Sequence, residues 1–322
     1  MAKKFNVFIG TFSNNLKRYL ESLPRSEKIA LIILIQLALL APLVPSAGWD
    51  FIATFRRETL SGAYGTRTFN PYPAYWVFQP FMILPPRLGF FLWNVVAVLG
   101  YIVALRHFKG KVLPFTLSIA CFWTLYIGQI EGLMSLGLVL GLVAGPFGAG
   151  LGLFLLTIKP QIGLFSILFI LFQRRDYRLL LVPATIYFAS LIFWGWWIPD
   201  WIESIISRDL TGNPSNISIW PYGLVLLPLL FYRPNSLRIW LLVQSLILPY
   251  FPIYSLAILF TMYVPNWANI AFWLLYILAS YYPLQDFAFI IPLLMLIQLF
   301  WREQKTRNSS IRHNKKVFHK IE

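Results

Sequence analysis

Long apolar runs recur along the chain, and they decide the class of fold that it can form. The first, residues 29–44, is interrupted only by Gln36 and Pro42. With its flanks it is long enough to cross a bilayer core of roughly 30 Å. Of the 322 residues, 58% are hydrophobic and 12% are charged, which is more apolar surface than a soluble domain can cover. The runs do not alternate in polarity as barrel strands do. The sequence predicts an all-α polytopic membrane protein.

Three parts follow from the distribution of charge. Residues 1–28 carry apolar side chains at spacings of three and four with lysines between them, which predicts a basic amphipathic helix on the anionic membrane surface. A merely solvated basic leader is the alternative. Residues 29–301 form the transmembrane domain, with a first outer loop at 46–75 and a second at 199–220. Residues 302–322 form a basic tail.

The positions of the basic residues predict the orientation in the membrane. With the N-terminus inside, 21 of the 27 Lys and Arg residues fall on the inner side. This is the asymmetry that the positive-inside rule requires, so the net charge of +15 indicates topology and not a nucleic-acid partner. We therefore expect about 10–12 transmembrane helices and both termini in the cytoplasm. Segments 88–105 and 112–127 are expected to cross, 75–84 to be interfacial, and 145–148 to form a tight turn.

Polar and charged side chains gather on the predicted outer side, although they come from three separate loops. Ionisable groups near membrane depth are costly, so their convergence predicts a shared polar cavity. The candidates are Asp50, Arg56, Arg57, Arg67, Gln129, Glu131, Lys159 and Gln161.

The charged candidates also have structural explanations. Asp50 is a favoured N-cap residue for a helix that begins at Phe51. Glu131 and Lys159 are also interpreted as a simple buried ion pair between neighbouring helices. The three arginines are alternatively a solvated rim around the first loop.

Several kinds of chemistry are disfavoured by what the sequence lacks. It has one cysteine, Cys121, within an apolar run, and three histidines, two of them in the last ten residues. Neither a thiolate nor a histidine metal centre is expected. No GxxxxGK[ST] phosphate loop and no HExxH motif occur. The prediction is that no cofactor is needed, with a divalent ion beside Asp50 and Glu131 left open. An outward-facing enzyme would lack nucleotide donors, and it would need a substrate that arrives activated on a lipid phosphate.

A set of short motifs occurs in a fixed order along the chain: Trp49-Asp50, Asn70-Pro71-Tyr72-Pro73, Leu84-Pro85-Pro86, Gly128-Gln129, Lys159-Pro160-Gln161 and Arg174-Arg175. Together these motifs resemble the multispan GT-C glycosyltransferases, and within them glycosyltransferase family 87, the polyprenyl-phosphate-mannose-dependent α-mannosyltransferases of bacterial envelopes. The resemblance covers roughly residues 29–180, and 249–254 match a later family loop only loosely. Glu131 stands where the family often has a neutral amide.

This resemblance implies an inverting transfer of a sugar to an envelope lipid or glycan acceptor on the outer side. Asp50 matches the family's first-loop acid and would act as catalytic base. The arginines would bind the leaving polyprenyl phosphate, and Tyr72, Gln129, Glu131, Lys159 and Gln161 would bind substrate. A groove near residues 75–84 would hold the lipid tail. A flippase or carrier of lipid-linked sugars is the alternative function, and a non-catalytic envelope scaffold is the third.

Overall fold

The protein is helical throughout the part that the structure describes. This computed structural model describes residues 18–61, 70–207, 213, 215–279, 281–282 and 285–318, with the backbone alone for 61, 285 and 306–318. Within these residues the β-structure is limited to one isolated bridge, between Asn216 and Pro252. The prediction of an all-α fold is confirmed. Most of the predicted amphipathic helix 1–28, and Arg67, lie outside the described residues.

The first half of the chain holds the helices around which the rest packs. They are α2 (Arg25–Leu40), η1 (Ala41–Leu43), the π-helix η2 (Trp49–Arg56), α3 (Arg57–Ser61), α4 (Ala74–Met82), α5 (Pro86–Phe108), α6 (Val112–Thr116), α7 (Ile119–Ile127), α8 (Glu131–Val143), α9 (Pro146–Thr157) and α10 (Pro160–Arg174).

The second half is more broken, with shorter helices and several 3-10 turns. They are η3 (Tyr177–Leu180), α11 (Leu181–Trp194), α12 (Ile198–Ile206), η4 (Tyr222–Leu226), α13 (Pro228–Tyr232), α14 (Leu237–Ile247), η5 (Ile253–Leu256), α15 (Ala257–Phe260), α16 (Asn266–Ala279), η6 (Gln285–Phe287) and α17 (Ile290–Phe318).

Three of the described helical segments are long and apolar enough to cross a membrane: Arg25–Leu43, Pro86–Phe108 and Tyr177–Trp194. A fourth results if α7 and α8, which are bent by 113° relative to each other, form one broken span. Five shorter apolar helices also occur. Short helices are tolerated at membrane depth when protein surrounds them. Multiple apolar helices are therefore confirmed, whereas the number of 10–12 spans and the cytoplasmic position of both termini stay predictions.

Two local expectations are wrong, and both depend on residues that begin helices. Residues 112–127 were expected to form one crossing, but they form α6 and α7. Ser118 separates these helices and caps α7, since its side chain accepts a hydrogen bond from the Cys121 backbone N–H. The expected turn at 145–148 is instead the start of α9, with Gly145 as N-cap and Pro146 at the first helical position.

Helices α5 and α8 cross with their backbones in contact. A Cβ atom added at Gly100 would lie 2.1 Å from the Gly132 carbonyl oxygen, and one added at Gly132 would lie 2.4 Å from that of Ala97. Small residues permit this close approach between apolar helices. The crossing fixes the start of α8 against the middle of α5.

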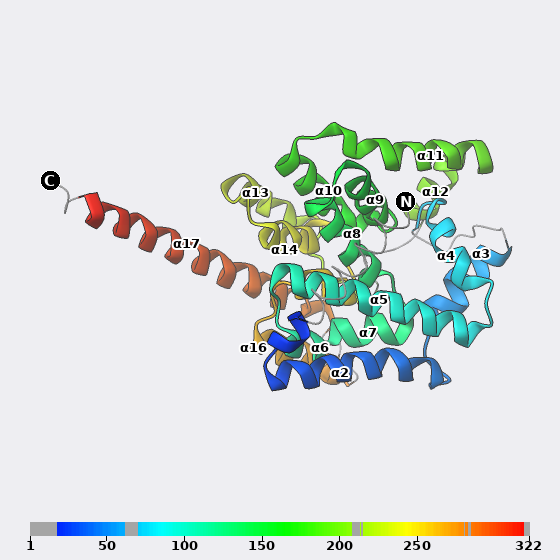
Figure 1. The fold of residues 1–322 in the computed structure, drawn as a ribbon, viewed down its shortest axis with the longest axis horizontal. Helices are drawn as coiled ribbons and strands as arrows, with labels where there is room; N and C mark the ends of the chain where they lie inside the picture. Colours follow the sequence, from blue (N-terminus) through cyan, green and yellow to red (C-terminus); the bar gives the residue numbers. More distant parts are fainter. Residues whose placement is uncertain are drawn as a thin grey trace.

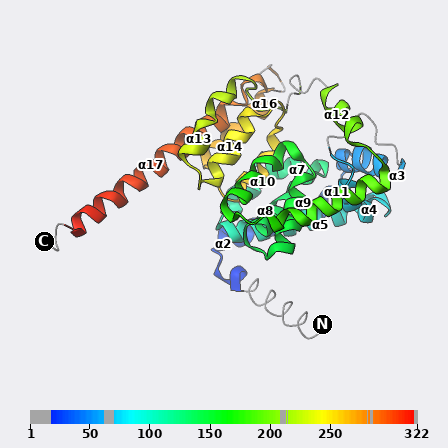
Figure 2. The ribbon, with the colours of Figure 1, turned by 90° about the horizontal axis from the view of Figure 1, so that it is seen from above.

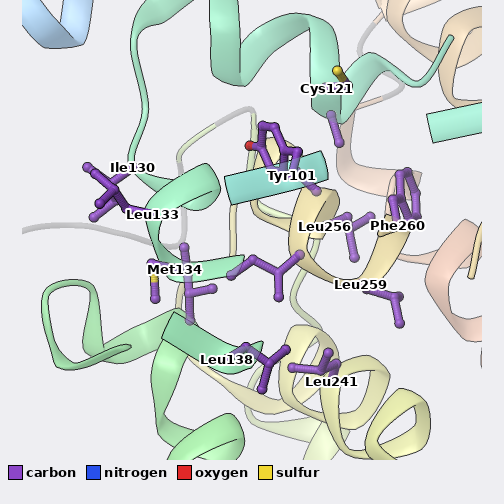
Figure 3. Close-up of a cluster of buried hydrophobic side chains, with 14 of the residues drawn as sticks. Tyr101, Cys121, Ile130, Leu133, Met134, Leu138, Leu241, Leu256, Leu259 and Phe260 are labelled. Carbon is purple, nitrogen blue, oxygen red and sulfur yellow. The ribbon is translucent and has the colours of Figure 1, made fainter. Parts of the chain in front are cut away.

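The apolar side chains at the start of α8 belong to a buried cluster with residues of α5, α7, α14, η5 and α15 (Figure 3). Glu131 directly follows Ile130 in this buried helix start, and its side chain is itself completely buried. The labelled members of the cluster are Tyr101, Cys121, Ile130, Leu133, Met134, Leu138, Leu241, Leu256, Leu259 and Phe260.

The bundle has one element that leaves it. Helices α2, α5 and α7 run side by side along one edge in Figure 1, and α11 lies along the opposite edge. The first part of α17 packs against α14 and α16, and its C-terminal part extends away from the other helices in both views (Figures 1 and 2).

Candidate functional site

Asp50 is held at the start of η2 by its glycine neighbour. Gly48 precedes η2 with a φ of 80°, and its N–H donates to the Tyr126 carbonyl at 2.7 Å. A side chain at Gly48 would approach the Phe90 ring to 2.9 Å, so this turn requires glycine. Gly48 occupies the N-cap position, and no side chain caps η2. The interpretation of Asp50 as an N-cap is therefore wrong. Its Oδ2 instead accepts a short hydrogen bond from Gln129 Nε2.

Gln129 lies in the break between α7 and α8. Gly128 ends α7 in the left-handed region, with a φ of 82°. The Trp93 indole N–H lies 3.1 Å from the carbonyl oxygens of both Gly128 and Gln129, which fixes the backbone of the break. The Gln129 side chain then extends between Asp50 and Lys159, and its Oε1 accepts a hydrogen bond of 3.0 Å from Lys159 Nζ.

Lys159 and Glu131 form a buried ion pair behind the amide. Their Nζ and Oε1 atoms are 2.7 Å apart, and the side chains are 6% and 0% exposed. The Ser255 hydroxyl donates to the same Glu131 oxygen at 2.9 Å, and Lys159 Nζ lies 4.6 Å from the centre of the Tyr254 ring. Buried charges are tolerated when paired and hydrogen-bonded in this way. The sequence interpretation of an ion pair is confirmed.

A polar cavity of about 300 Å³ opens beside this array. Asp50 and Lys159 are its charged lining residues in the described part of the chain. The lining consists of Asp50, Thr54, Phe55, Asn70, Gln129, Lys159, Asn213, Ser215, Tyr250 and Tyr254. The cavity thus brings together segments that are distant in the sequence: the first loop, the α7–α8 break, the start of α10 and the region at the start of η5.

An apolar cavity of about 350 Å³ adjoins the polar one. Ser215 and Tyr254 line both, so the two spaces are neighbours with Tyr254 between them. The remaining lining residues are all apolar or aromatic: Trp123, Ile127, Ile253, Phe272, Leu275, Tyr276, Ala279 and Ala288. The arrangement suits a molecule with a charged part and an apolar part.

The surroundings of Asp50 perturb its acidity. Burial raises the pKa of the Asp50 carboxyl above its usual range, and the negative charge of Glu131 adds to the rise. The hydrogen bond from Gln129 and the positive charge of Lys159 act in the opposite direction. A carboxylate with a raised pKa is a stronger base, which favours proton transfer from a substrate hydroxyl.

The other predicted site residues are not brought onto the cavity wall. Arg56 is half-buried, and its Nη1 is buried with no hydrogen-bond partner in the described structure. Arg57 is exposed. The Tyr72 ring stacks on Trp197 with a centroid distance of 4.9 Å. Gln161 lies in the first turn of α10, where its backbone carbonyl accepts from Gln244 Nε2.

Sequence reasoning left Tyr250, Tyr254, Ser215 and Ser255 out of the candidate site. The signal for the two tyrosines was the loose match at 249–254. Nothing local distinguishes Ser215 or Ser255, which reach the site only through tertiary packing. As for a metal, no group of three or more His, Cys, Asp or Glu lies together among the described residues.

One comparison with known proteins decides the family. Residues 69–301, well over half of the chain, match glycosyltransferase family 87. The chain belongs to glycosyltransferase family 87. This family 87 protein is thus a glycosyltransferase, and its apolar helices are those of a membrane protein. The match contains Gln129, Lys159 and Tyr254, while Asp50 precedes it. No curated protein and no solved structure matches the chain.

Proposed function

We propose that this family 87 protein is an inverting GT-C-type enzyme that transfers mannose from a polyprenyl-phosphate donor to an envelope lipid or glycan on the outer side of the membrane. The observation that supports the proposal is the adjacency of the two cavities. One is polar and contains a buried acid and a buried cation, and the other is apolar, and Tyr254 contributes to both. A polyprenyl-phosphate sugar has a polar sugar phosphate, which would suit the polar cavity, and an apolar polyprenyl chain, which would suit the apolar one.

Asp50 is the base in the proposed reaction. It removes the proton from the acceptor hydroxyl while that oxygen forms a bond to the anomeric carbon of the sugar. The bond from the anomeric carbon to the phosphate oxygen breaks, and polyprenyl phosphate leaves with the electron pair. General-base catalysis contributes roughly 10²–10⁴-fold. Because Gln129 holds Oδ2, we assign the proton transfer to Oδ1.

The phosphate gains negative charge as its bond to the anomeric carbon breaks. A positively charged side chain beside it therefore binds it more strongly in the transition state than in the ground state. Lys159 supplies this charge on the cavity wall. Two of its ammonium hydrogens are directed to Gln129 and Glu131, which leaves a third for a ligand. Of the two first-loop arginines that the structure describes, Arg56 is the better candidate for a second contact, because its buried Nη1 has no partner among the described residues and Arg57 is exposed.

The first part of the lipid tail is assigned to the apolar cavity beside Tyr254, and not to a groove near residues 75–84. In α4, which covers most of that segment, Tyr75, Phe78 and Met82 are buried in the protein core. Those side chains pack against other residues and do not present a surface to a lipid. The apolar cavity instead shares Tyr254 with the polar cavity that Asp50 and Lys159 line.

Sugar transfer in proteoliposomes tests the proposal. Protein would be reconstituted with polyprenyl-phosphate mannose and a crude envelope-lipid acceptor, and wild type would be compared with Asp50→Asn. Asn keeps an oxygen for the Gln129 hydrogen bond, so we expect loss of turnover by roughly 10²–10⁴-fold without loss of folding. The matched control is Asp200→Asn, which removes an exposed carboxylate on α12. Undiminished transfer by Asp50→Asn would disprove the role of Asp50. Absence of transfer by wild type with several lipid-linked sugars, together with their movement across the membrane, would establish a carrier.

A further inference from the structure

A third cavity, of about 590 Å³, lies far from the candidate site. It is lined by the last residue of α5, the segment between α13 and α14, and α17. Phe108 lines it, whereas Trp93 of the same helix contacts the Gln129 backbone. Fifteen residues of α-helix separate these two positions, which corresponds to about 22 Å. The full lining is Phe108, Tyr232, Arg233, Pro234, Asn235, Ser236, Leu237, Arg238, Met262 and Glu303.

Arg233 has buried hydrogen-bond donors that no group in the described part of the chain satisfies. Its Nε and Nη2 atoms are inaccessible to solvent and have no hydrogen-bond partner in the described structure. The guanidinium lies against two aromatic rings that contact each other, with its Cζ 5.0 Å from the centre of Tyr232 and 5.4 Å from that of Phe300. Leaving buried donors unsatisfied is costly, and more so on a charged group. A rotamer change that turns these donors into the cavity, toward a ligand with acceptor oxygens, would remove this cost.

The remaining polar groups of the cavity are largely occupied by one another. Ser236 Oγ donates to Glu303 Oε1 at 2.7 Å, and Asn235 Oδ1 accepts from Gln173 Nε2 at 2.8 Å. Arg238, in the first turn of α14, adds a second guanidinium to the lining. Neither arginine forms an ion pair with Glu303 within the described residues. Two cations therefore face one carboxylate, and the excess charge of the lining is positive.

We propose that this cavity binds a phosphate ester through Arg233 and Arg238, and that the ester is the headgroup of an anionic membrane lipid. The planar fork of a guanidinium matches phosphate oxygens and binds them with charge-assisted hydrogen bonds. The apolar side chains of Phe108, Leu237 and Met262 complete the cavity, and they suit the glycerol and upper acyl region of a lipid. The sequence places residues 233–238 and 302 on the inner side, where anionic lipids attract basic groups. This inference does not depend on the proposed sugar transfer.

Binding measurements on the detergent-purified full chain test the proposal. The probes are dioctanoyl phosphatidylglycerol, dioctanoyl phosphatidylcholine and inorganic phosphate, and the dissociation constant of each is measured by thermophoresis. We expect phosphatidylglycerol to bind at least tenfold more tightly than phosphatidylcholine. Arg233→Gln and Arg238→Gln should each weaken it at least tenfold. The matched control Lys305→Gln removes an exposed cation from α17 that does not line the cavity, and should change binding less than twofold.

Two further results separate the sources of the phosphate and guard against a folding defect. Inorganic phosphate that binds as tightly as phosphatidylglycerol would overturn the lipid assignment in favour of a soluble phosphate. Arg233→Gln loses two ring contacts, so if it elutes as aggregate in size-exclusion chromatography the test rests on Arg238→Gln, for which no ring contact is described. Equal binding of phosphatidylglycerol by wild type and a well-folded arginine variant would overturn the phosphate site itself.

Discussion

Removing the cation of the Glu131–Lys159 pair is expected to destabilise the protein strongly. In Lys159→Met the carboxylate of Glu131 remains completely buried, and among the described residues only the Ser255 hydroxyl still donates to its Oε1. Breaking a buried ion pair by removing one partner costs about 3–5 kcal/mol. At about 2 °C per kcal/mol for a large domain, the unfolding midpoint should fall by roughly 6–10 °C. Thermal unfolding followed by the fluorescence of the 13 tryptophans measures this change.

A second substitution separates the loss of charge balance from the loss of packing. In Lys159→Met combined with Glu131→Gln, no uncompensated charge remains, so the double variant should be more stable than Lys159→Met alone. The expected coupling energy between the two sites is about 1–3 kcal/mol. Lys305→Met, at an exposed position, is the control and should leave the midpoint within about 1 °C. A midpoint for Lys159→Met within about 2 °C of wild type, or strictly additive effects, would refute the reasoning.

Three more outcomes are expected. Transfer requires ionised Asp50, so kcat/KM should fall as pH drops through the raised pKa of Asp50. Glu131→Gln should move this acidic limb of the pH–rate profile to lower pH, because the charge of Glu131 raises that pKa. An acidic limb that does not move would contradict the assignment. Gly128→Ala should lower the free energy of unfolding by about 2–4 kcal/mol, measured with denaturant, because φ is 82° and the new Cβ would lie 2.6 Å from the Cβ of Phe51. The control Gly145→Ala, where the new Cβ meets open space, should lower it by about 1 kcal/mol or less. EDTA should leave transfer unchanged because Lys159 supplies the positive charge on the cavity wall, and inhibition reversed by a divalent ion would contradict this.

The helical membrane fold could be predicted because it depends on composition and on the length of apolar runs. Helices α2 and α5 follow from such runs directly. The break at Ser118 could not be predicted in the same way, since one serine within an apolar stretch is compatible with a continuous helix. The Ser118 side chain accepts a hydrogen bond from the Cys121 backbone N–H, and this cap makes α7 a separate helix. Only the structure shows that contact.

The sequence pointed to the charged residues of the candidate site, because charge is rare in this chain. It did not point to the site residues of common types, such as tyrosine and serine. Glu131 and Lys159 are conspicuous because they are ionisable groups in an apolar sequence. Tyr254 is one of 16 tyrosines, and its hydroxyl reaches Gln129 across 125 residues of chain. Arg57 carries as much charge as Lys159 but faces solvent, because the fold of η2 and α3 and not its residue type sets its direction.

The orientation of the Gln129 amide limits which side chain this position accepts. Its nitrogen donates to Asp50 and its oxygen accepts from Lys159, so the array requires a donor and an acceptor on one side chain of that reach. Glutamate would set a second negative charge against Asp50, lysine would offer no acceptor to its neighbour, and asparagine is one methylene shorter. Residue 129 can therefore change in a homologue only if the residue at position 50 or at position 159 changes with it.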